Sequence, residues 1–110
     1  MKLTEARCVP CHGGMLPLAE ARARELLLEV PGWAIEGGVL VRTFTFKNYC
    51  ETVSFVNAVA WISHREDHHP DIEFGYKTCR IRYSTHAIGG LSENDFICAA
   101  KVSALLPAPA

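Results

Sequence analysis

The sequence predicts a single α+β domain, a four-stranded antiparallel sheet with helices packed on one face, in the order α-β-β-α-β-β-α. The chain has 110 residues, of which 49% are hydrophobic, and this supports one modest core but not two. Helix-forming composition alternates with pairs of segments in which apolar and polar residues alternate, as they do in half-buried strands. Every predicted link between elements is short, which favours antiparallel neighbours.

The first half of the chain predicts a helix followed by a β-hairpin. Residues 17–30 are rich in Ala, Leu, Glu and Arg, which favour helix, and a Pro-Gly pair then ends it. Residues 33–36 and 39–46 are predicted strands, joined by a Gly-Gly pair that permits positive φ. In the second strand we expect the face that carries Phe44 to point inward.

The longest predicted helix runs from Tyr49 to Glu66. Asn48 is its predicted N-cap, because an Asn side chain can accept a hydrogen bond from an amide of the first turn. At 100° per residue most apolar side chains fall on one half of this helix, as expected for a helix that lies on a sheet. Trp61 is the exception, on the polar half, and is either an isolated exposed residue or part of a contact surface.

The second half predicts another hairpin and a last helix. Residues 71–76 and 77–84 are predicted strands, and Gly75 is a possible bulge. The last helix begins after Ser92, a predicted N-cap that forms a capping box with Asp95. The helix before this hairpin must end ahead of His69, because the following proline disfavours helical dihedrals there.

Four of the five histidines lie between positions 64 and 86. The unperturbed pKa of histidine lies closest to neutrality, so this cluster indicates proton-transfer chemistry. The cluster belongs to a spaced pattern of five elements: His64, His68-His69-Pro70, Tyr76, His86 and Asp95. This pattern resembles that of the pterin-4a-carbinolamine dehydratases, and the likeness extends over about residues 16–105.

The resemblance implies an enzyme that removes water from 4a-hydroxy-tetrahydropterin to give quinonoid dihydropterin, without a metal or redox cofactor. It implies that His68 and His86 are general acids and that His69 positions the substrate. His64 stands where many members have an acidic residue. It further implies that Asp67 and Asp95 orient imidazoles or bind the pterin edge, and Ser84 and Thr85 are predicted to bind the substrate.

The resemblance also implies an alternative in which the protein is a binding or assembly module. Dehydratase-like proteins include a dimerisation cofactor of a transcription factor and factors that assist assembly of RuBisCO. Such a role would use a surface, for example Trp61 or the strand face with Arg80 and Arg82.

Residues 1–16 form a predicted arm that contains Cys8-Val9-Pro10-Cys11-His12. Cys-x-x-Cys-His is the spacing of haem c attachment, and a zinc site would need two further ligands. The third interpretation is an ordered arm or flexible leader. An odd number of cysteines makes a disulfide framework improbable.

The formal net charge of -1 shows no excess of basic residues, which argues against direct nucleic-acid binding. No segment has the apolar length of a signal peptide or a membrane span, so we expect a cytoplasmic protein without a membrane partner. Residues 17–106 are the predicted domain, and residues 107–110 a flexible tail. The resemblance implies a homodimer or homotetramer.

Overall fold

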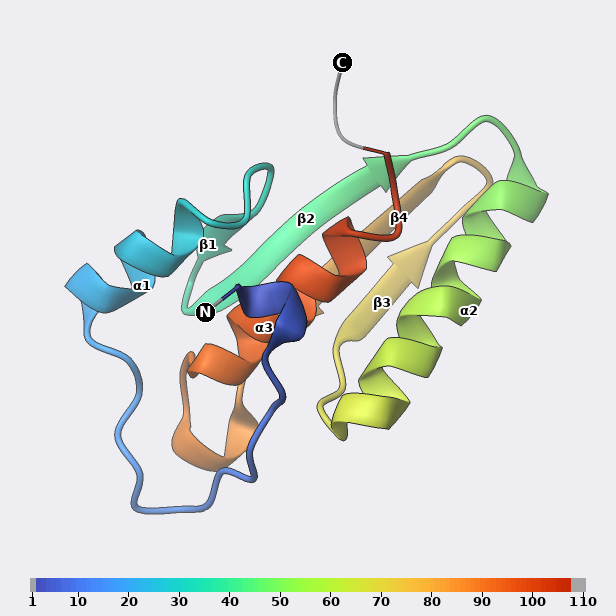
Figure 1. Ribbon diagram of the computed structural model, residues 1–110. Helices are drawn as coiled ribbons and strands as arrows, with labels where there is room; N and C mark the ends of the chain where they lie inside the picture. The colour runs from blue at the N-terminus through green and yellow to red at the C-terminus, as the bar shows by residue number, and fades with distance from the viewer. Residues whose placement is uncertain (1, 108–110) are drawn as a thin grey trace.

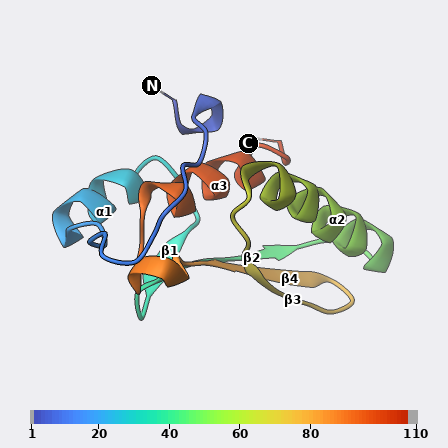
Figure 2. The ribbon, with the colours of Figure 1, turned by 90° about the horizontal axis from the view of Figure 1, so that it is seen from below.

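The computed structural model describes residues 2–107 and has two layers, a four-stranded sheet and a layer of helices on one of its faces (Figures 1 and 2). The strands are β1 (Ala34–Glu36), β2 (Val39–Thr45), β3 (Asp71–Phe74) and β4 (Thr78–Tyr83), in the spatial order β1-β2-β4-β3. All neighbouring strands are antiparallel. The predicted fold class and element order are therefore confirmed.

The helical layer contains α1 (Glu20–Leu27), α2 (Tyr49–Glu66) and α3 (Glu93–Ser103). Two short 3-10 helices, η1 (Leu3–Glu5) and η2 (His86–Ile88), complete the structure. In Figure 1 α3 lies between α1 and α2, and the N-terminal segment crosses it. No helix in the described part of the chain combines the length and the apolar character needed to cross a bilayer.

The bounds of α2 agree with the prediction, and so does its N-cap. The side chain of Asn48 accepts a hydrogen bond from the amide of Glu51 at 2.9 Å. The buried positions of α2 recur every three or four residues and form the stripe that faces the sheet. They are Thr52, Phe55, Val59, Ser63 and Glu66.

Two local predictions were wrong. The first helix is shorter than residues 17–30, and Leu28, inside the predicted range, is 83% exposed. Gly75 is not a bulge but part of the hairpin turn, where its amide donates to the carbonyl of Thr78.

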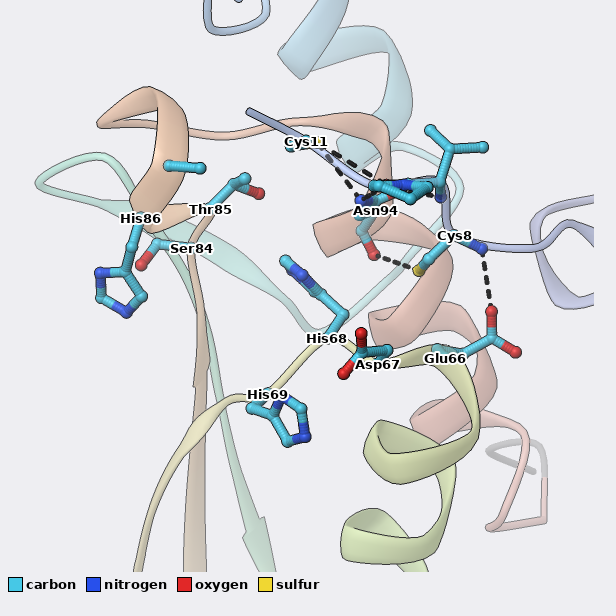
Figure 3. A pocket seen from close by; sticks show the side chains of 13 residues that line it. Cys8, Cys11, Glu66, Asp67, His68, His69, Ser84, Thr85, His86 and Asn94 are labelled. Atoms are coloured by element: carbon cyan, nitrogen blue, oxygen red, sulfur yellow. Dashed lines mark hydrogen bonds between the residues drawn. The ribbon is translucent and has the colours of Figure 1, made fainter. Parts of the chain in front are cut away.

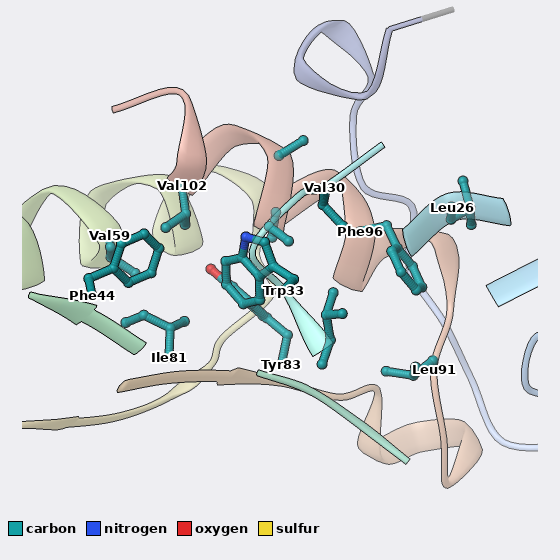
Figure 4. Packing of buried hydrophobic residues seen from close by; sticks show 14 of the residues in the cluster. Leu26, Val30, Trp33, Phe44, Val59, Ile81, Tyr83, Leu91, Phe96 and Val102 are labelled. Atoms are coloured by element: carbon teal, nitrogen blue, oxygen red, sulfur yellow. The ribbon is translucent and has the colours of Figure 1, made fainter. Parts of the chain in front are cut away.

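The core lies between the sheet and the helices (Figure 4). Trp33 packs edge-on against Phe44, with ring centroids 6.0 Å apart, and its indole N–H donates to Ser103 Oγ. Phe96 of α3 is fully buried in the same cluster, as is Tyr83 of β4. This packing fixes the end of β4 relative to the start of α3, and that junction supports the site.

The described part of the predicted tail is Pro107 alone, since residues 108–110 lie outside the described residues.

Candidate functional site

A pocket of about 420 Å³ opens where the end of α2, the end of β4 and the start of α3 meet (Figure 3). This volume lies within the range of small-molecule sites. Six of the seven predicted site residues line it: Asp67, His68, His69, Ser84, Thr85 and His86. The seventh, Asp95, reaches the pocket through hydrogen bonds to two of these residues.

The end of α2 places His68 in the pocket. Asp67 is the C-cap residue and has left-handed dihedrals, with φ 51°, which Asp tolerates better than most residues. Its amide donates to the carbonyl of His64, and the amide of His68 donates to the carbonyl of Ser63. This pair of bonds is the Schellman arrangement, which turns the chain sharply out of the helix.

The His68 side chain is held by Asp95, which is completely buried at the start of α3. His68 Nε2 lies 2.6 Å from Asp95 Oδ1. The other oxygen, Asp95 Oδ2, accepts hydrogen bonds from Thr85 Oγ1 at 2.8 Å and from the amide of Ser92 at 2.9 Å. Carboxylate oxygens accept hydrogen bonds, so this contact uses the Nε2–H tautomer of His68 and leaves Nδ1 for another partner.

The amide bond from Ser92 belongs to a capping box, as the sequence predicts. Asp95 therefore has two roles at once, because one carboxylate closes the first turn of α3 and orients an imidazole.

The ring of His68 also stacks on Tyr83, with centroids 5.8 Å apart and planes 7° apart. The Tyr83 hydroxyl is hydrogen-bonded to Ser63 Oγ at 3.0 Å. Burial is the main cause that raises the pKa of Tyr83 far above its usual range, so the phenol stays neutral. The imidazole is thus fixed at its edge by a carboxylate and on its face by an aromatic ring, and its side chain is only 11% exposed.

The other two predicted histidines are not held in this way. His69 and His86 are both exposed, and their side chains have no hydrogen-bond partner within residues 2–107. His86 begins η2, directly after β4. In Figure 3 its imidazole projects from the strand end on the opposite side of the pocket from Cys8. These side chains are free to contact a ligand.

Two elements of the sequence pattern lie outside the pocket. The ring of His64 stacks on Trp61 on the outside of α2, with centroids 5.7 Å apart. Tyr76 is 62% exposed in the turn between β3 and β4, where it stacks on Tyr49. Neither residue is among those that line the site.

Sequence reasoning missed one whole side of the pocket, which the N-terminal arm supplies. Cys8, Val9, Pro10 and Cys11 line it together with Asn94. The sequence held one signal. Glu66 ends a helix, where the helix dipole disfavours an acidic side chain, and this indicates a compensating partner.

The structure shows the partners of Glu66, two of which lie in the arm. Its carboxylate accepts a hydrogen bond from the amide of Cys8 at 2.9 Å and pairs with Lys101 at 3.0 Å and Arg7 at 3.1 Å. Burial by itself raises the pKa of Glu66, but the hydrogen bonds from Cys8 and Lys101, together with the positive charges of Lys101 and Arg7, hold the pKa below its ordinary value. The carboxylate therefore stays ionised beneath the arm.

The cysteines of the arm do not form a metal cluster in the structure. Residues 2–107 contain no group of three or more His, Cys, Asp or Glu side chains arranged to hold a metal ion. Cys8 Sγ instead lies 3.6 Å from Cys98 Sγ. The hydrogen bond with Cys8, and then burial, raise the pKa of the Cys98 thiol far above its usual range.

Comparison with known proteins identifies the family. Residues 16–105 match the model of the pterin 4 alpha carbinolamine dehydratase family. The chain belongs to this family. Relatives from Stenotrophomonas maltophilia and Nitrosomonas eutropha, which carry provisional names as pterin-4-alpha-carbinolamine dehydratases, are 62% and 58% identical. Each match covers 94% of this chain, and 90% and 93% of the respective relative.

Two solved structures of dehydratase-like proteins share the fold. A transcriptional coactivator/pterin dehydratase from Brucella melitensis is 27% identical, with a TM-score of 0.78 over 81% of this chain and 97% of its own. A pterin dehydratase-like protein identified as a RuBisCO assembly factor in the alpha-carboxysome is 31% identical. Its TM-score is 0.58, over 67% of this chain and 88% of its own.

Proposed function

We propose that the protein is an enzyme that removes water from 4a-hydroxy-tetrahydropterin and yields quinonoid dihydropterin, a step in the recycling of tetrahydrobiopterin. The observation that carries the proposal is the arrangement of three histidines around one pocket, with His68 oriented by the buried carboxylate of Asp95. Membership of the dehydratase family supports the same substrate class.

The reaction needs proton transfer more than anything else. Hydroxide is a poor leaving group, so an acid must protonate it as the C4a–O bond breaks, and a base must accept the proton that the pterin loses. The lone pair of the neighbouring ring nitrogen stabilises the developing cation, so no metal or redox cofactor is required. The products are water and the quinonoid dihydropterin.

The geometry supports a division of roles among the histidines. His68 is the oriented proton-transfer group, because Asp95 fixes its Nε2–H and can stabilise an imidazolium that forms during the transfer. His86 is the second proton-transfer group, and its exposure lets it exchange its proton with water between turnovers. His69, which also lines the pocket, positions the pterin.

The polar groups near these histidines would bind the substrate. Ser84 and Asp67 line the pocket with side chains that have no partner in the described chain. Thr85 has a different role, because its hydroxyl donates to Asp95 and accepts from Ser92, so it holds the carboxylate in place.

The test is the rate at which 4a-hydroxy-tetrahydropterin disappears, followed by ultraviolet absorbance. We expect acceleration over buffer by the wild type, and its loss in a His68→Ala, His86→Ala double variant. His64→Ala is the matched control, because His64 lies outside the pocket. No acceleration by folded wild type would contradict the proposal, as would full activity of the double variant.

A second candidate function is assembly of a partner protein, and the likeness to the RuBisCO assembly factor favours it. Trp61 is 62% exposed and suits such a contact. The arginine face suits it less, since Arg80 and Arg82 already pair with Glu36 and Glu73 across the sheet. If the protein assembles RuBisCO, Trp61→Ala will lower the yield of assembled RuBisCO in a reconstitution and leave pterin turnover intact.

We also propose that the protein is cytoplasmic and self-associates as a homodimer or homotetramer. The edge strands β1 and β3 each have one unpaired side in the described chain, and pairing between copies would cover it. Sedimentation equilibrium measures the state directly.

A further inference from the structure

The arm segment Cys8–Cys11 forms one side of the pocket, yet the proposed reaction assigns it no role. In Figure 3 this segment lies across the pocket from His69 and His86. Cys8 and Val9 carry mainly apolar surface, as does Pro10 between the two thiols. The pocket therefore has a histidine side and an apolar side.

The segment has no regular structure of its own. Residues 6–12 belong to no helix or strand. Their position depends on contacts to the rest of the protein, and the most specific of these comes from Asn94, in the first turn of α3. Its Oδ1 accepts from the amide of Val9 at 3.0 Å, and its Nδ2 donates to the carbonyl of Val9 at 2.6 Å.

The two bonds satisfy both backbone groups of one residue, as a neighbouring strand would. Asn94 is only 5% exposed, so its amide group has little access to water as an alternative partner. One residue earlier, the amide of Cys8 is bound by Glu66. Consecutive backbone amides of the arm are thus held by two buried polar side chains from α3 and α2.

The arm is not part of the region that defines the family, because the family model begins at residue 16. The match to the curated relatives covers 94% of this chain, more than residues 16–110 can supply. It therefore extends into the arm. The arm is a feature that these relatives share with this chain beyond the family's defining region.

We propose that Cys8–Cys11 is a substrate-contacting wall of the site, and that Asn94 is the residue that positions it. The inference rests on the proposed function, since it takes a pterin as the ligand. A pterin is a flat bicycle with apolar faces and a polar edge. The arm wall covers one face of the pterin ring, and the histidines contact the groups of the pterin that gain and lose protons.

The proposal predicts that substrate affinity depends on the fraction of molecules whose arm is closed. A ligand that needs the closed arm binds more weakly in proportion to the loss of that fraction. Val9→Pro removes the amide that donates to Asn94 and leaves α3 untouched. The next residue is already a proline, which disfavours helical dihedrals at position 9 in the wild type as well.

The experiment compares Val9→Pro with Leu16→Pro. Leu16 also stands directly before a proline, and its amide donates no hydrogen bond within residues 2–107. Two quantities are measured on the full chain: hydrogen exchange at the amide of Cys8, and the dissociation constant of unsubstituted pterin, followed by its fluorescence.

We expect Val9→Pro to lose protection at Cys8 and to raise the dissociation constant about tenfold, which corresponds to closure in roughly a tenth of molecules. Leu16→Pro is expected to match the wild type in both. Full protection at Cys8 in Val9→Pro would overturn the positioning role of Asn94. Lost protection with unchanged pterin affinity would overturn the contact with substrate.

Failure of the proposed function gives a different result. If the wild type binds pterin but does not accelerate dehydration, the proposed function is contradicted while the comparison of the two proline variants still decides this inference. If the wild type binds no pterin, the proposed function and the contact of the arm with a pterin are both contradicted.

Discussion

The two sides of the pocket are built in opposite ways. The core wall consists of His68, Thr85 and Asp95, whose positions follow from helix ends and a strand end that pack into the main core. The arm wall, Cys8–Cys11, has no regular structure and is held by the side chains of Asn94 and Glu66.

Because the two walls are built differently, substrate binding can change independently of stability and chemistry. The core wall cannot move without disrupting the capping of α3, so changes there should affect stability and chemistry together. The arm wall depends on a few polar contacts and can open locally while the rest of the fold persists. Changes there should alter binding and leave the core intact.

The largest effect is expected at Asp95. Asp95→Asn removes the charge that orients His68 and puts an amide group where Thr85 and the Ser92 amide donate. We expect kcat to fall by about 100-fold, within the usual range for general acid-base catalysis. The free energy of unfolding should fall by about 1–3 kcal/mol, because a buried donor loses its acceptor.

Enzyme assays and urea unfolding measure the two effects of Asp95→Asn. Asp71→Asn is the control, since Asp71 is exposed at the start of β3. A normal kcat in folded Asp95→Asn would show that the carboxylate is not part of the catalytic arrangement.

The second largest effect is expected at low pH, where protonation of the Glu66 carboxylate should detach the arm. Because its pKa is lower in the folded protein than the unfolded value of about 4.3, the carboxylate stabilises the arm fully above that pH. This contribution is lost as pH falls through the folded pKa. As the pH is lowered, the Cys8 amide should lose its protection from hydrogen exchange at a higher pH than the Leu18 amide, after correction for intrinsic exchange rates. The Leu18 amide is the reference because it is bound to the carbonyl of Leu91.

Glu66→Gln should weaken the arm at neutral pH by about 2 kcal/mol, the typical contribution of a hydrogen bond to a charged group. Glu73→Gln, which breaks an exposed ion pair with Arg82, should cost about 0.5 kcal/mol or less. Equal protection of Cys8 in both variants would contradict the role of Glu66.

A smaller effect is expected at Tyr83, which supports His68 through its ring. Tyr83→Phe keeps the stacking surface, and Ser63 keeps its bond to the carbonyl of Val59. Stability should fall by about 1 kcal/mol, the net value of one hydrogen bond, with kcat changed by less than about twofold. A large loss of kcat would mean that the hydroxyl itself takes part in catalysis.

The smallest effect is expected in the reactivity of two buried thiols. Cys98 lies against Cys8 of the arm wall, whereas Cys79 lies in the core. Cys79 and Cys98 are both fully buried, whereas Cys50 is exposed. Burial raises the pKa of Cys79 to about 11, so of Cys50, Cys79 and Cys98 only Cys50 should react with iodoacetamide at pH 8 in the wild type. In Val9→Pro we expect Cys98 to become reactive and Cys79 to stay protected. Identical labelling of the two buried thiols in both proteins would contradict the separation of arm and core.

The sequence predicts the core wall well because its signals are local and periodic. The helix 49–66, its cap and the capping box at Ser92 follow from side chains a few positions apart. The family resemblance groups His68, His86 and Asp95, and the fold brings these residues to one junction. The structure adds which imidazole Asp95 contacts, that of His68, 27 residues away.

The arm wall was not predictable in the same way. Its contacts join Val9 to Asn94 and Cys8 to Glu66, 85 and 58 residues apart, through single side chains without periodicity. The Cys-x-x-Cys-His motif drew attention to haem and zinc, whereas the arm is anchored by its backbone amides. Only the unfavourable position of Glu66 at a helix end hinted at a partner.

The most direct test of this account is the steady-state kinetics of His86→Gln and Val9→Pro, measured side by side with wild type. We predict that His86→Gln lowers kcat by about 100-fold with little change in KM, since it removes the imidazole proposed as the second proton-transfer group. Val9→Pro should raise KM about tenfold and leave kcat within about twofold. If both variants change the same parameter, or if neither differs from wild type, the separation of proton transfer by the histidines from substrate binding by the arm wall is wrong.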